Sequence, residues 1–299
     1  MDKEILFYMS ADTLEDVKPI GDVFDLRGKV AVVTGTVGLA LSVINRLAEC
    51  GAQVVFGSRT EEWGTLAEET LKDKGYHVSY LKTDVRKVDD CYALTGFAEK
   101  TYGTVDIVVP AAATWGARAF VDMKEEEWDD VIDTDLKGQY FTVQAAARSM
   151  IRGGKGGKVV TIASVAHRGD DMTKIAMMTN YNAAKAGVLG MTKGMAKELK
   201  QYGINVNCAA PGGMLTPGAM MNNLQSSALY GAEWDDDVKT YGLGTPIATT
   251  PDEVALVVVA MCTDISNYMY GQLIEADGGS QFSFQEKPWS YTMEGGLHG

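Results

Sequence analysis

The sequence predicts a doubly wound α/β fold, in which helices cover both faces of a parallel sheet. Two observations support this prediction. Short apolar runs of strand length alternate along the chain with longer segments of helical periodicity. The series begins with a strand pattern at 29–34, a glycine-containing turn and a helical pattern that reaches Leu47, which is the order typical of a dinucleotide-binding unit.

The remaining elements follow in alternation. Strands are predicted at 53–56, 77–81, 105–109, 158–162, 204–209 and 272–275. Helices are predicted at 61–74, 88–100, 128–150, 181–202 and 251–262. The segment from 213 to about 241 is irregular, polar and rich in methionine, and is expected to form a lid. Because no Pro-rich linker or repeat divides the chain, we predict one catalytic domain at 28–279, an N-terminal extension at 1–27 and a C-terminal tail at 280–299.

Tyr181 and Lys185 form the candidate acid/base. They lie four residues apart at the start of a helix-periodic run, so both side chains are expected on one helical face. A phenol has an ordinary pKa of about 10, and an adjacent ammonium group lowers that pKa by stabilising the phenolate. The same spacing also arises by chance on ordinary amphipathic helices, so the pair alone leaves both interpretations open.

Ser164 follows the β-branched run at 158–162, where a strand is expected to end. Strand ends in an open parallel sheet face the ligand crevice. Ser164 is therefore a candidate to hydrogen-bond a substrate carbonyl that Tyr181 protonates. The alternative is a serine that caps the turn after the strand.

The turn Gly35-Thr36-Val37-Gly38 is a candidate phosphate-binding site. Glycines at this position let the backbone approach a pyrophosphate, whose charge is stabilised by free N–H groups at the N-terminus of the following helix. The turn stands between a predicted strand and a predicted helix, which is the context that such a site requires.

Composition favours small-molecule chemistry. Lys and Arg total 27 against 40 Asp and Glu, and the net charge of -13 argues against nucleic acid or anionic membranes as partners. The four cysteines and three histidines are scattered, so reduced thiols and no metal site are expected. The sequence shows neither a signal-peptide pattern nor a run that could span a bilayer, and we expect a cytoplasmic protein.

Residues 27–280 resemble the short-chain dehydrogenase/reductase family. The matching motifs are Thr34-Gly35 with Gly38, Asp84-Val85, Ser164, Tyr181 with Lys185, Pro211-Gly212 with Thr216, and Asp277-Gly278-Gly279. The resemblance implies a Rossmann-like sheet of seven parallel strands, a homotetramer, and reversible hydride transfer between a nicotinamide and a carbonyl or alcohol. It implies that Tyr181 is the acid/base, that Lys185 lowers its pKa and holds the nicotinamide ribose, and that Ser164 orients the carbonyl.

The resemblance also implies the cofactor-binding residues. These are Gly35, Val37, Gly38, Leu39, Ser58, Arg59, Asp84, Val85, Ala111, Ala112, Tyr181, Lys185, Pro211, Gly212, Met214 and Thr216. For Asp84 the alternative is an N-cap of the helix that begins near Val88.

The chain departs from the family pattern at several points. Only two residues separate Gly35 from Gly38, so the turn must be tighter than usual. Pro110-Ala111-Ala112-Ala113 replaces the family's Asn-Asn-Ala-Gly, which removes an amide that usually ties strands together. Asp135 stands where the family has a fourth catalytic residue, an asparagine, and a carboxylate there favours a charged Lys185. The interval from Ser164 to Tyr181 is about four residues longer than usual.

Candidate substrate contacts come from the loops and the lid. They are Trp115, His167, Met214, Met220 and Leu224. Methionines form an adaptable apolar wall that suits flat apolar substrates. The alternatives are that the methionines fill gaps beneath a loop, and that His167 is a surface histidine.

A closer resemblance concerns the ends of the chain and the glycine turn. The N-terminal extension, the two-residue glycine interval and the aromatic C-terminal tail resemble the bacterial 20β-hydroxysteroid dehydrogenases, which implies NADH-linked reduction of the C20 ketone of cortisol-like steroids. Locally, Ser58 and Arg59 favour NADP(H) instead, because no acid is present and Arg59 can pair with a 2′-phosphate. The alternatives are a polyol or sugar dehydrogenase, a broad ketoreductase, and a nucleotide-binding sensor on an inactive fold.

Overall fold

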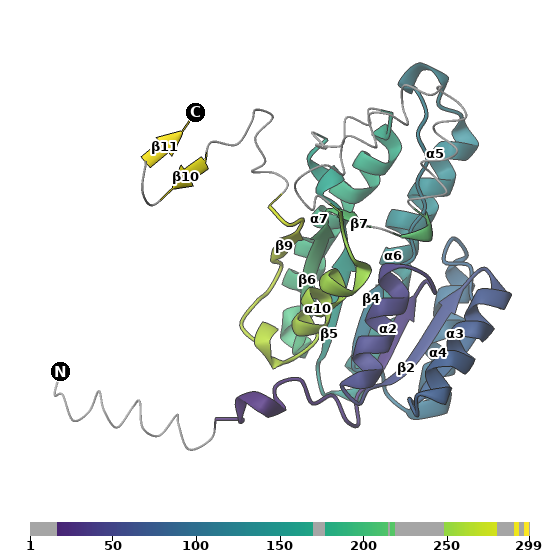
Figure 1. Ribbon diagram of the computed structural model, residues 1–299. Helices are drawn as coiled ribbons and strands as arrows, with labels where there is room; N and C mark the ends of the chain where they lie inside the picture. The colour runs from purple at the N-terminus through teal and green to yellow at the C-terminus, as the bar shows by residue number, and fades with distance from the viewer. Residues whose placement is uncertain are drawn as a thin grey trace.

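A single parallel sheet organises the protein, as a computed structural model shows. The structure describes residues 17–169, 177–214, 216–218, 248–279, 290–292 and 296–298. Seven parallel strands lie in the order β3-β2-β1-β4-β5-β6-β9 (Figure 1). Their bounds are β1 Val30–Thr34, β2 Gln53–Ser58, β3 Val78–Lys82, β4 Ile107–Pro110, β5 Gly157–Ile162, β6 Ile204–Pro211 and β9 Leu273–Ala276. The predicted doubly wound, seven-stranded α/β fold is confirmed.

Helices cover both faces of this sheet. Their bounds are α2 Leu39–Glu49, α3 Glu61–Asp73, α4 Val88–Tyr102, α5 Glu125–Ile132, α6 Gly138–Gly153, α7 Thr179–Leu199 and α10 Pro251–Met261. One apolar cluster joins α2, α3 and α10 to one face, and a second joins α4, α6 and α7 to the other (Figure 1). Strands that are covered on both faces do not alternate between buried and exposed residues, and every residue of β1 and β6 is buried.

The sheet reverses its strand order between β1 and β4, which are neighbours on either side of the switch point. In open parallel sheets, ligands bind outside the carboxyl ends of the strands at this position. The glycine turn after β1 and the Ser164 segment after β5 both lie at these carboxyl ends.

The long helix predicted at 128–150 is interrupted. A π-helical turn, Asp133–Lys137, separates α5 from α6. A π-turn inserts an extra residue, a feature that apolar periodicity does not reveal and that often marks a functional position. Here it contains Asp135, which is completely buried.

The segment predicted as an irregular lid begins as a strand. Gly213–Met214 forms β7 and pairs in parallel with β8, Ala248–Thr249. The expectation of irregular structure is therefore wrong at these two residues, because their strand partner is distant in the sequence and local patterns do not reveal it. Residues 215 and 219–247 lie outside the described residues, as do the predicted contacts Met220 and Leu224.

Both ends of the chain carry small further elements. A 3-10 turn, η1, spans Ile20–Asp22, and Lys18 forms an ion pair of 2.9 Å with Asp264. Near the other end, β10 (Ser290–Thr292) pairs antiparallel with β11 (Gly296–His298). The division into extension, catalytic domain and tail stays a prediction. No helix among the described residues is long and apolar enough to cross a membrane.

Core packing yields a stability prediction. Leu47 on α2 is fully buried in the cluster that joins α2, α3 and α10. Leu47→Ala is expected to lower the free energy of unfolding by about 2–5 kcal/mol, because it removes buried methyl groups and leaves a cavity. Leu66→Ala on α3 is the control, since Leu66 is 61% exposed. Urea unfolding measures both, and equal effects would contradict the packing described above.

Candidate active site

Tyr181 and Lys185 project from the first turns of α7. The Lys185 Nζ atom lies 5.3 Å from the centroid of the Tyr181 ring. Asn180 fixes the start of the helix: its Oδ1 accepts a hydrogen bond from the Tyr181 N–H at 2.8 Å, and its Nδ2 donates to the Glu127 carbonyl on α5 at 3.2 Å. Asn180 is only 2% exposed, and sequence reasoning missed it because an amide side chain carries no spacing signal.

A buried ion pair lies behind this helical face. Asp135 Oδ2 is 3.0 Å from Lys185 Nζ, and the two side chains are 0% and 1% exposed. Lys185 Nζ also donates to the Ile162 carbonyl at the end of β5, at 3.1 Å. The π-turn, β5 and α7 thus meet at one ammonium group, and the structure brings Asp135 beside the lysine.

Burial and the ion pair act on the pKa of both groups. Burial alone lowers the pKa of Lys185, but the charges of Asp135 and Tyr181 oppose it, and the net direction is upward. Burial raises the pKa of Asp135, against the lowering effect of Lys185. The first shift keeps Lys185 charged, whereas the second favours a neutral Asp135. The geometry supports the charged pair, because Oδ2 faces an ammonium and Oδ1 accepts an N–H bond.

The same carboxylate positions an aromatic wall beside Tyr181. Asp135 Oδ1 accepts a hydrogen bond of 2.8 Å from the Thr114 N–H, in the loop after β4. The next residue, Trp115, lies with its ring centroid 6.4 Å from that of Tyr181, at an interplanar angle of 46°. Trp115, a predicted substrate contact, therefore lies directly beside the candidate acid.

Ser164 caps the 3-10 turn η4, Val165–Arg168, through a 3.2 Å bond that its Oγ accepts from the Ala166 N–H. The capping alternative is thus present in the structure. It leaves the hydroxyl hydrogen able to donate to a substrate oxygen, so the two roles are compatible. The orienting role of Ser164 stays a prediction.

His167 is held by the edge strand. Its Nε2 lies 3.0 Å from Glu275 Oε1 on β9, and Arg168 donates to the same oxygen at 2.7 Å. The His167 side chain is 13% exposed, so it is partly buried against β9, and its contact with substrate stays a prediction. The cluster ties η4, and with it Ser164, to β9.

Gln139 is a further side chain that the sequence did not single out. It lies on α6, is 2% exposed, and donates from Nε2 to the Ile162 carbonyl at 2.8 Å and to the Asp135 carbonyl at 3.0 Å. Its Oε1 accepts from the Ile162 N–H at 3.0 Å. Gln139 therefore touches both the strand end and the π-turn that support Lys185.

The glycine turn fits a dinucleotide pyrophosphate. Gly35 and Gly38 have φ values of +98° and +56°, conformations that other residues rarely adopt. A Cβ on Gly35 would lie 2.8 Å from that of Ala40 and 3.5 Å from Ala112, and a Cβ on Gly38 would lie 3.0 Å from Thr216. Both glycines therefore lie too close to neighbouring residues to carry a side chain, and the turn from Gly35 to Gly38 is called the glycine cradle below.

The neighbouring predicted contacts surround this cradle. Val37 is exposed at 37%, whereas Leu39 is buried as the first residue of α2. Ala112 donates its N–H to Thr34 Oγ1 at 3.1 Å, while Ala111 packs against the core. On the far side, the Gly212 N–H donates to the Ala276 carbonyl at 3.0 Å after the buried Pro211, and Met214 packs against the core.

The end of β2 is the position at which an acid that binds the ribose of the cofactor is expected. This chain has hydroxyl side chains and ion pairs there instead. Thr36 Oγ1 donates to Ser58 Oγ at 3.0 Å, a link between the glycine turn and β2 that sequence reasoning missed. Arg59 lies 3.8 Å from Asp130, whose Oδ1 also accepts a 2.7 Å bond from Arg86.

Asp84 does not cap α4. The residue at that N-cap is Lys87, and Asp84 instead binds the Arg86 guanidinium through both carboxylate oxygens. The Arg86 hydrogen bonds outweigh burial and hold the pKa of Asp84 below its usual range. The N-cap alternative for Asp84 is therefore wrong. Val85, the other half of this motif, is buried and within reach of a Cβ built on Gly138.

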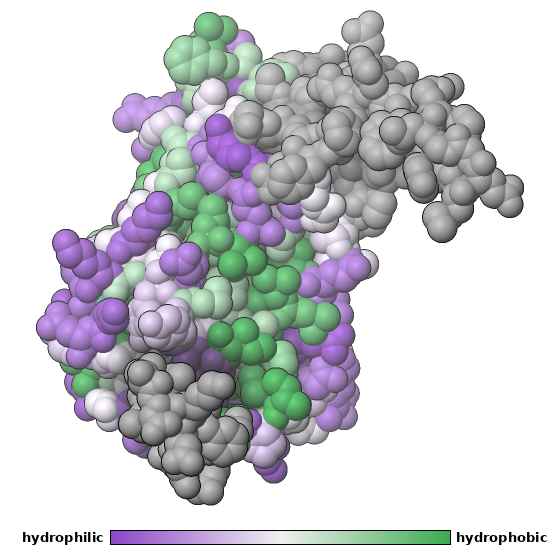
Figure 2. Space-filling view, turned by 90° about the vertical axis from the view of Figure 1, so that its left-hand side faces the viewer, coloured by the Kyte–Doolittle hydropathy of each residue, from purple (hydrophilic) through white to green (hydrophobic). Residues whose placement is uncertain are grey.

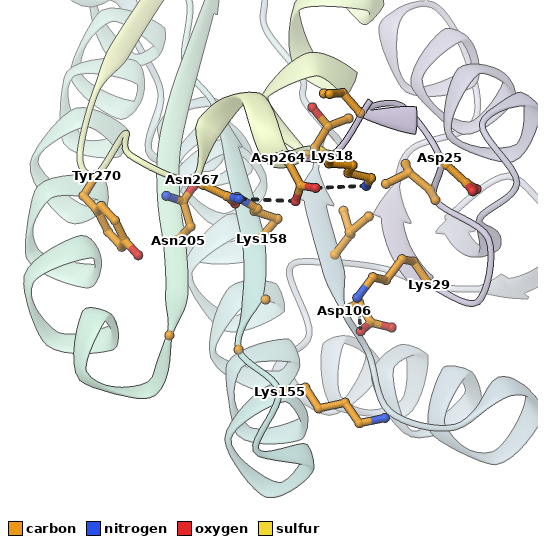
Figure 3. A pocket seen from close by; sticks show the side chains of 18 residues that line it. Lys18, Asp25, Lys29, Asp106, Lys155, Lys158, Asn205, Asp264, Asn267 and Tyr270 are labelled. Atoms are coloured by element: carbon orange, nitrogen blue, oxygen red, sulfur yellow. Dashed lines mark hydrogen bonds and ion pairs between the residues drawn. The ribbon is translucent and has the colours of Figure 1, made fainter. Parts of the chain in front are cut away.

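A pocket lies at the opposite end of the sheet from Tyr181, among the amino ends of β1, β4, β5 and β6 (Figure 3). Two of its lysines form ion pairs, Lys18 with Asp264 and Lys29 with Asp106, and Lys158 donates to Asn267. Lys155 also lines this pocket, to which we assign no function. Among the described residues no cluster of His, Cys, Asp or Glu could hold a metal, and all four cysteines are free thiols.

The buried pair predicts a stability pattern. Lys185→Met is expected to lower the free energy of unfolding by about 3–5 kcal/mol, because it leaves Asp135 buried without its counter-ion. Lys185→Met with Asp135→Asn removes both charges and is expected to recover most of that loss while remaining inactive. Urea unfolding at neutral pH tests this, and additive losses in the double variant would contradict the pairing.

Comparisons with known proteins agree with this geometry. A family profile described as short chain dehydrogenase matches residues 29–227. The 3-oxoacyl-(acyl-carrier-protein) reductase FabG of Chlamydia muridarum is 36% identical over 85% of this chain and 98% of its own. The 2-dehydro-3-deoxy-D-gluconate 5-dehydrogenase of Escherichia coli K12 is 33% identical over 86% and 96%.

Solved structures give the same result. An actinorhodin polyketide ketoreductase with NADPH superposes with a TM-score of 0.76 at 30% identity, over 84% of this chain and 97% of that one. A short-chain type dehydrogenase/reductase from Mycobacterium marinum has a TM-score of 0.77 at 30% identity, over 89% and 100%. With its seven-stranded sheet, its glycine cradle and its Tyr181–Lys185 pair, the chain belongs to the short-chain dehydrogenase/reductase family and is an NAD(P)-dependent oxidoreductase.

Proposed function

We propose that the protein reduces an uncharged ketone with a nicotinamide cofactor, and that Tyr181 is the proton donor. One observation supports the proposal that the substrate is uncharged. Three cations of the described residues on or beside the elements that carry Tyr181 pair with a carboxylate: Lys185 with Asp135, Arg118 with Glu127, and Arg168 with Glu275. The aromatic face of Trp115 lies beside the Tyr181 ring. This environment favours apolar contact over recognition of an anionic substrate.

Each residue of the candidate site has a separate role in the proposed reduction. The glycine cradle and Lys185 would hold the cofactor, which would supply the hydride. Tyr181 gives its phenolic proton to the carbonyl oxygen, and Ser164 donates a hydrogen bond to the same oxygen. The charged Lys185 stabilises the phenolate that remains, while Asp135 keeps Lys185 charged. In the reverse direction the Tyr181 phenolate accepts the proton of the alcohol.

For the substrate we propose a flat, apolar ketone, with the C20 ketone of cortisol-like steroids as the first candidate. Trp115 supplies apolar surface beside Tyr181. The resemblance of the termini and the glycine turn to 20β-hydroxysteroid dehydrogenases supports the same class. A 3-oxoacyl thioester is the second candidate, because a relative at 36% identity is a 3-oxoacyl reductase. The paired cations argue against a sugar acid.

For the cofactor we propose NAD(H), with NADP(H) as the alternative. Arg59 is the cation available to a 2′-phosphate, but Asp130 lies 3.8 Å from it and also binds Arg86. Two arginines therefore face two carboxylates, Asp84 and Asp130, and their charges balance. A phosphate would have to displace Asp130 from Arg59, which weakens this position as an anion site.

We further propose a cytoplasmic homotetramer. The side of the molecule that carries the edge strand β9 shows a gathering of apolar residues (Figure 2). Leu256, Ile265 and Tyr268, on α10 and on the turn that follows it, are exposed at 49%, 49% and 101%. Contact between subunits would remove such surface from water.

The proposed function is tested by the oxidation of NADH, and separately of NADPH, with cortisol, a 3-oxoacyl thioester, fructose and a simple ketone. Turnover of cortisol with NADH is the expected result. Tyr181→Phe is expected to lose at least about 99% of this turnover, since general acid catalysis contributes about 10²-fold or more. Its affinity for NADH should change little, because only a hydroxyl is removed.

Each other outcome of this assay has a meaning. Turnover of the thioester alone would replace the steroid by the second candidate. Full activity in Tyr181→Phe would remove Tyr181 from the chemistry. Binding of NADH without turnover of any carbonyl would favour a nucleotide sensor.

The cofactor proposal makes a separate prediction. Asp130→Asn is expected to lower the KM for NADPH by up to about five-fold, because it frees Arg59 from an exposed ion pair worth up to about 1 kcal/mol. The KM for NADH should stay the same. Asp129→Asn is the matched control, since Asp129 is an exposed neighbour on the same helix. A preference of the unchanged protein for NADPH would overturn the proposal of NAD(H).

A further inference from the structure

The end of β5 lacks a strand partner on one side. Strand β4 pairs with β5 only at Ile107 with Lys158 and at Val108 with Val159. On the other side, β6 continues to the strand end, where Ile162 pairs with Ala209 and the Ala163 N–H donates to the Ala209 carbonyl at 2.8 Å. Because bonding alternates between the two sides of a strand, the N–H and C=O of Ile162 face the side from which β4 has diverged.

Gln139 occupies this position with its side-chain amide. Nε2 donates to the Ile162 carbonyl at 2.8 Å, and Oε1 accepts from the Ile162 N–H at 3.0 Å. The amide thus makes both hydrogen bonds that a neighbouring strand would supply.

The same contacts reach the acid/base machinery. The Ile162 carbonyl accepts a second bond, from Lys185 Nζ at 3.1 Å, and Gln139 Nε2 also donates to the Asp135 carbonyl at 3.0 Å. One buried amide therefore links the acceptor of Lys185 to the π-turn that carries its counter-ion. Ser164 follows Ile162 by two residues, so the strand end that Gln139 holds also places the candidate carbonyl-binding hydroxyl.

We propose that Gln139 is a positioning residue for the reaction: its amide replaces the missing strand partner of Ile162 and thereby holds Lys185, Asp135 and Ser164 in register. The inference rests on the proposed function for its kinetic consequence. The competing explanation is a buried glutamine that contributes only to stability. A stability role would lower the unfolding temperature and leave the kcat of the folded protein unchanged.

The experiment compares Gln139→Met, which keeps the length of the side chain without its amide, with the unchanged protein. The kcat for the ketone identified above is expected to fall about ten-fold or more, since a displaced acid/base group loses transition-state contact equivalent to about 1.4 kcal/mol for each factor of ten. The Kd for the nucleotide should rise by a smaller factor than the kcat falls, because the glycine turn is untouched and only the Lys185 contact is displaced. Hydrogen exchange at the Ile162 amide should accelerate about ten-fold or more, because its acceptor is lost.

Thr142→Val is the matched control. Thr142 is also buried on α6, one turn after Gln139, and its hydroxyl donates to the Gly138 carbonyl within the helix at 2.7 Å. This variant should keep both the kcat and the slow exchange of Ile162. If Gln139→Met fails to fold, Gln139→Asn keeps the amide but is one methylene too short to reach Ile162, and the same two losses are expected.

An unchanged kcat in a folded variant that exchanges the Ile162 amide faster would overturn the positioning role. Unchanged exchange would overturn the link itself. If the unchanged protein reduces no ketone, the proposed function and the positioning role fail together, while the exchange measurement still decides whether Gln139 holds the strand end.

Discussion

The structure of the candidate active site depends on a charged lysine in the protein interior. Lys185 and Asp135 are both inaccessible to solvent, and a lone ion in that position would cost several kcal/mol. Their contact of 3.0 Å compensates this cost only while three separate segments stay in register: the π-turn, the end of β5 and the start of α7. The remaining features of the site can be understood as supports for that register.

Each support comes from ordinary fold geometry. A parallel sheet brings the carboxyl ends of β1, β4 and β5 to one edge, so the glycine cradle, the Trp115 loop and Ser164 meet there. The π-turn gives Asp135 a position that it would not have on a regular helix. The Thr114 N–H donates a hydrogen bond to Asp135, and the next residue, Trp115, lies beside Tyr181. One carboxylate thus serves both the electrostatics and the shape of the site.

Much of this arrangement could be predicted from local patterns. The strands, the helices and the Tyr181–Lys185 spacing are local in sequence, and periodicity reveals them. The π-turn was missed because one inserted residue hardly disturbs an apolar period, and β7 because its two-residue ladder depends on Ala248–Thr249. Gln139 and Thr36 were missed because their partners, Ile162 and Ser58, are fixed only by tertiary packing.

If a buried, charged Lys185 makes Tyr181 an effective acid/base, as proposed, Lys185 must lower the pKa of the Tyr181 phenol, and that pKa can be measured. An ultraviolet titration of the protein, with the titration of Tyr181→Phe subtracted, isolates this phenol from the other 12 tyrosines. A midpoint clearly below the ordinary value of about 10 is expected. A midpoint at or above that value would show that the ammonium does not stabilise the phenolate, and would contradict the proposed role of Lys185.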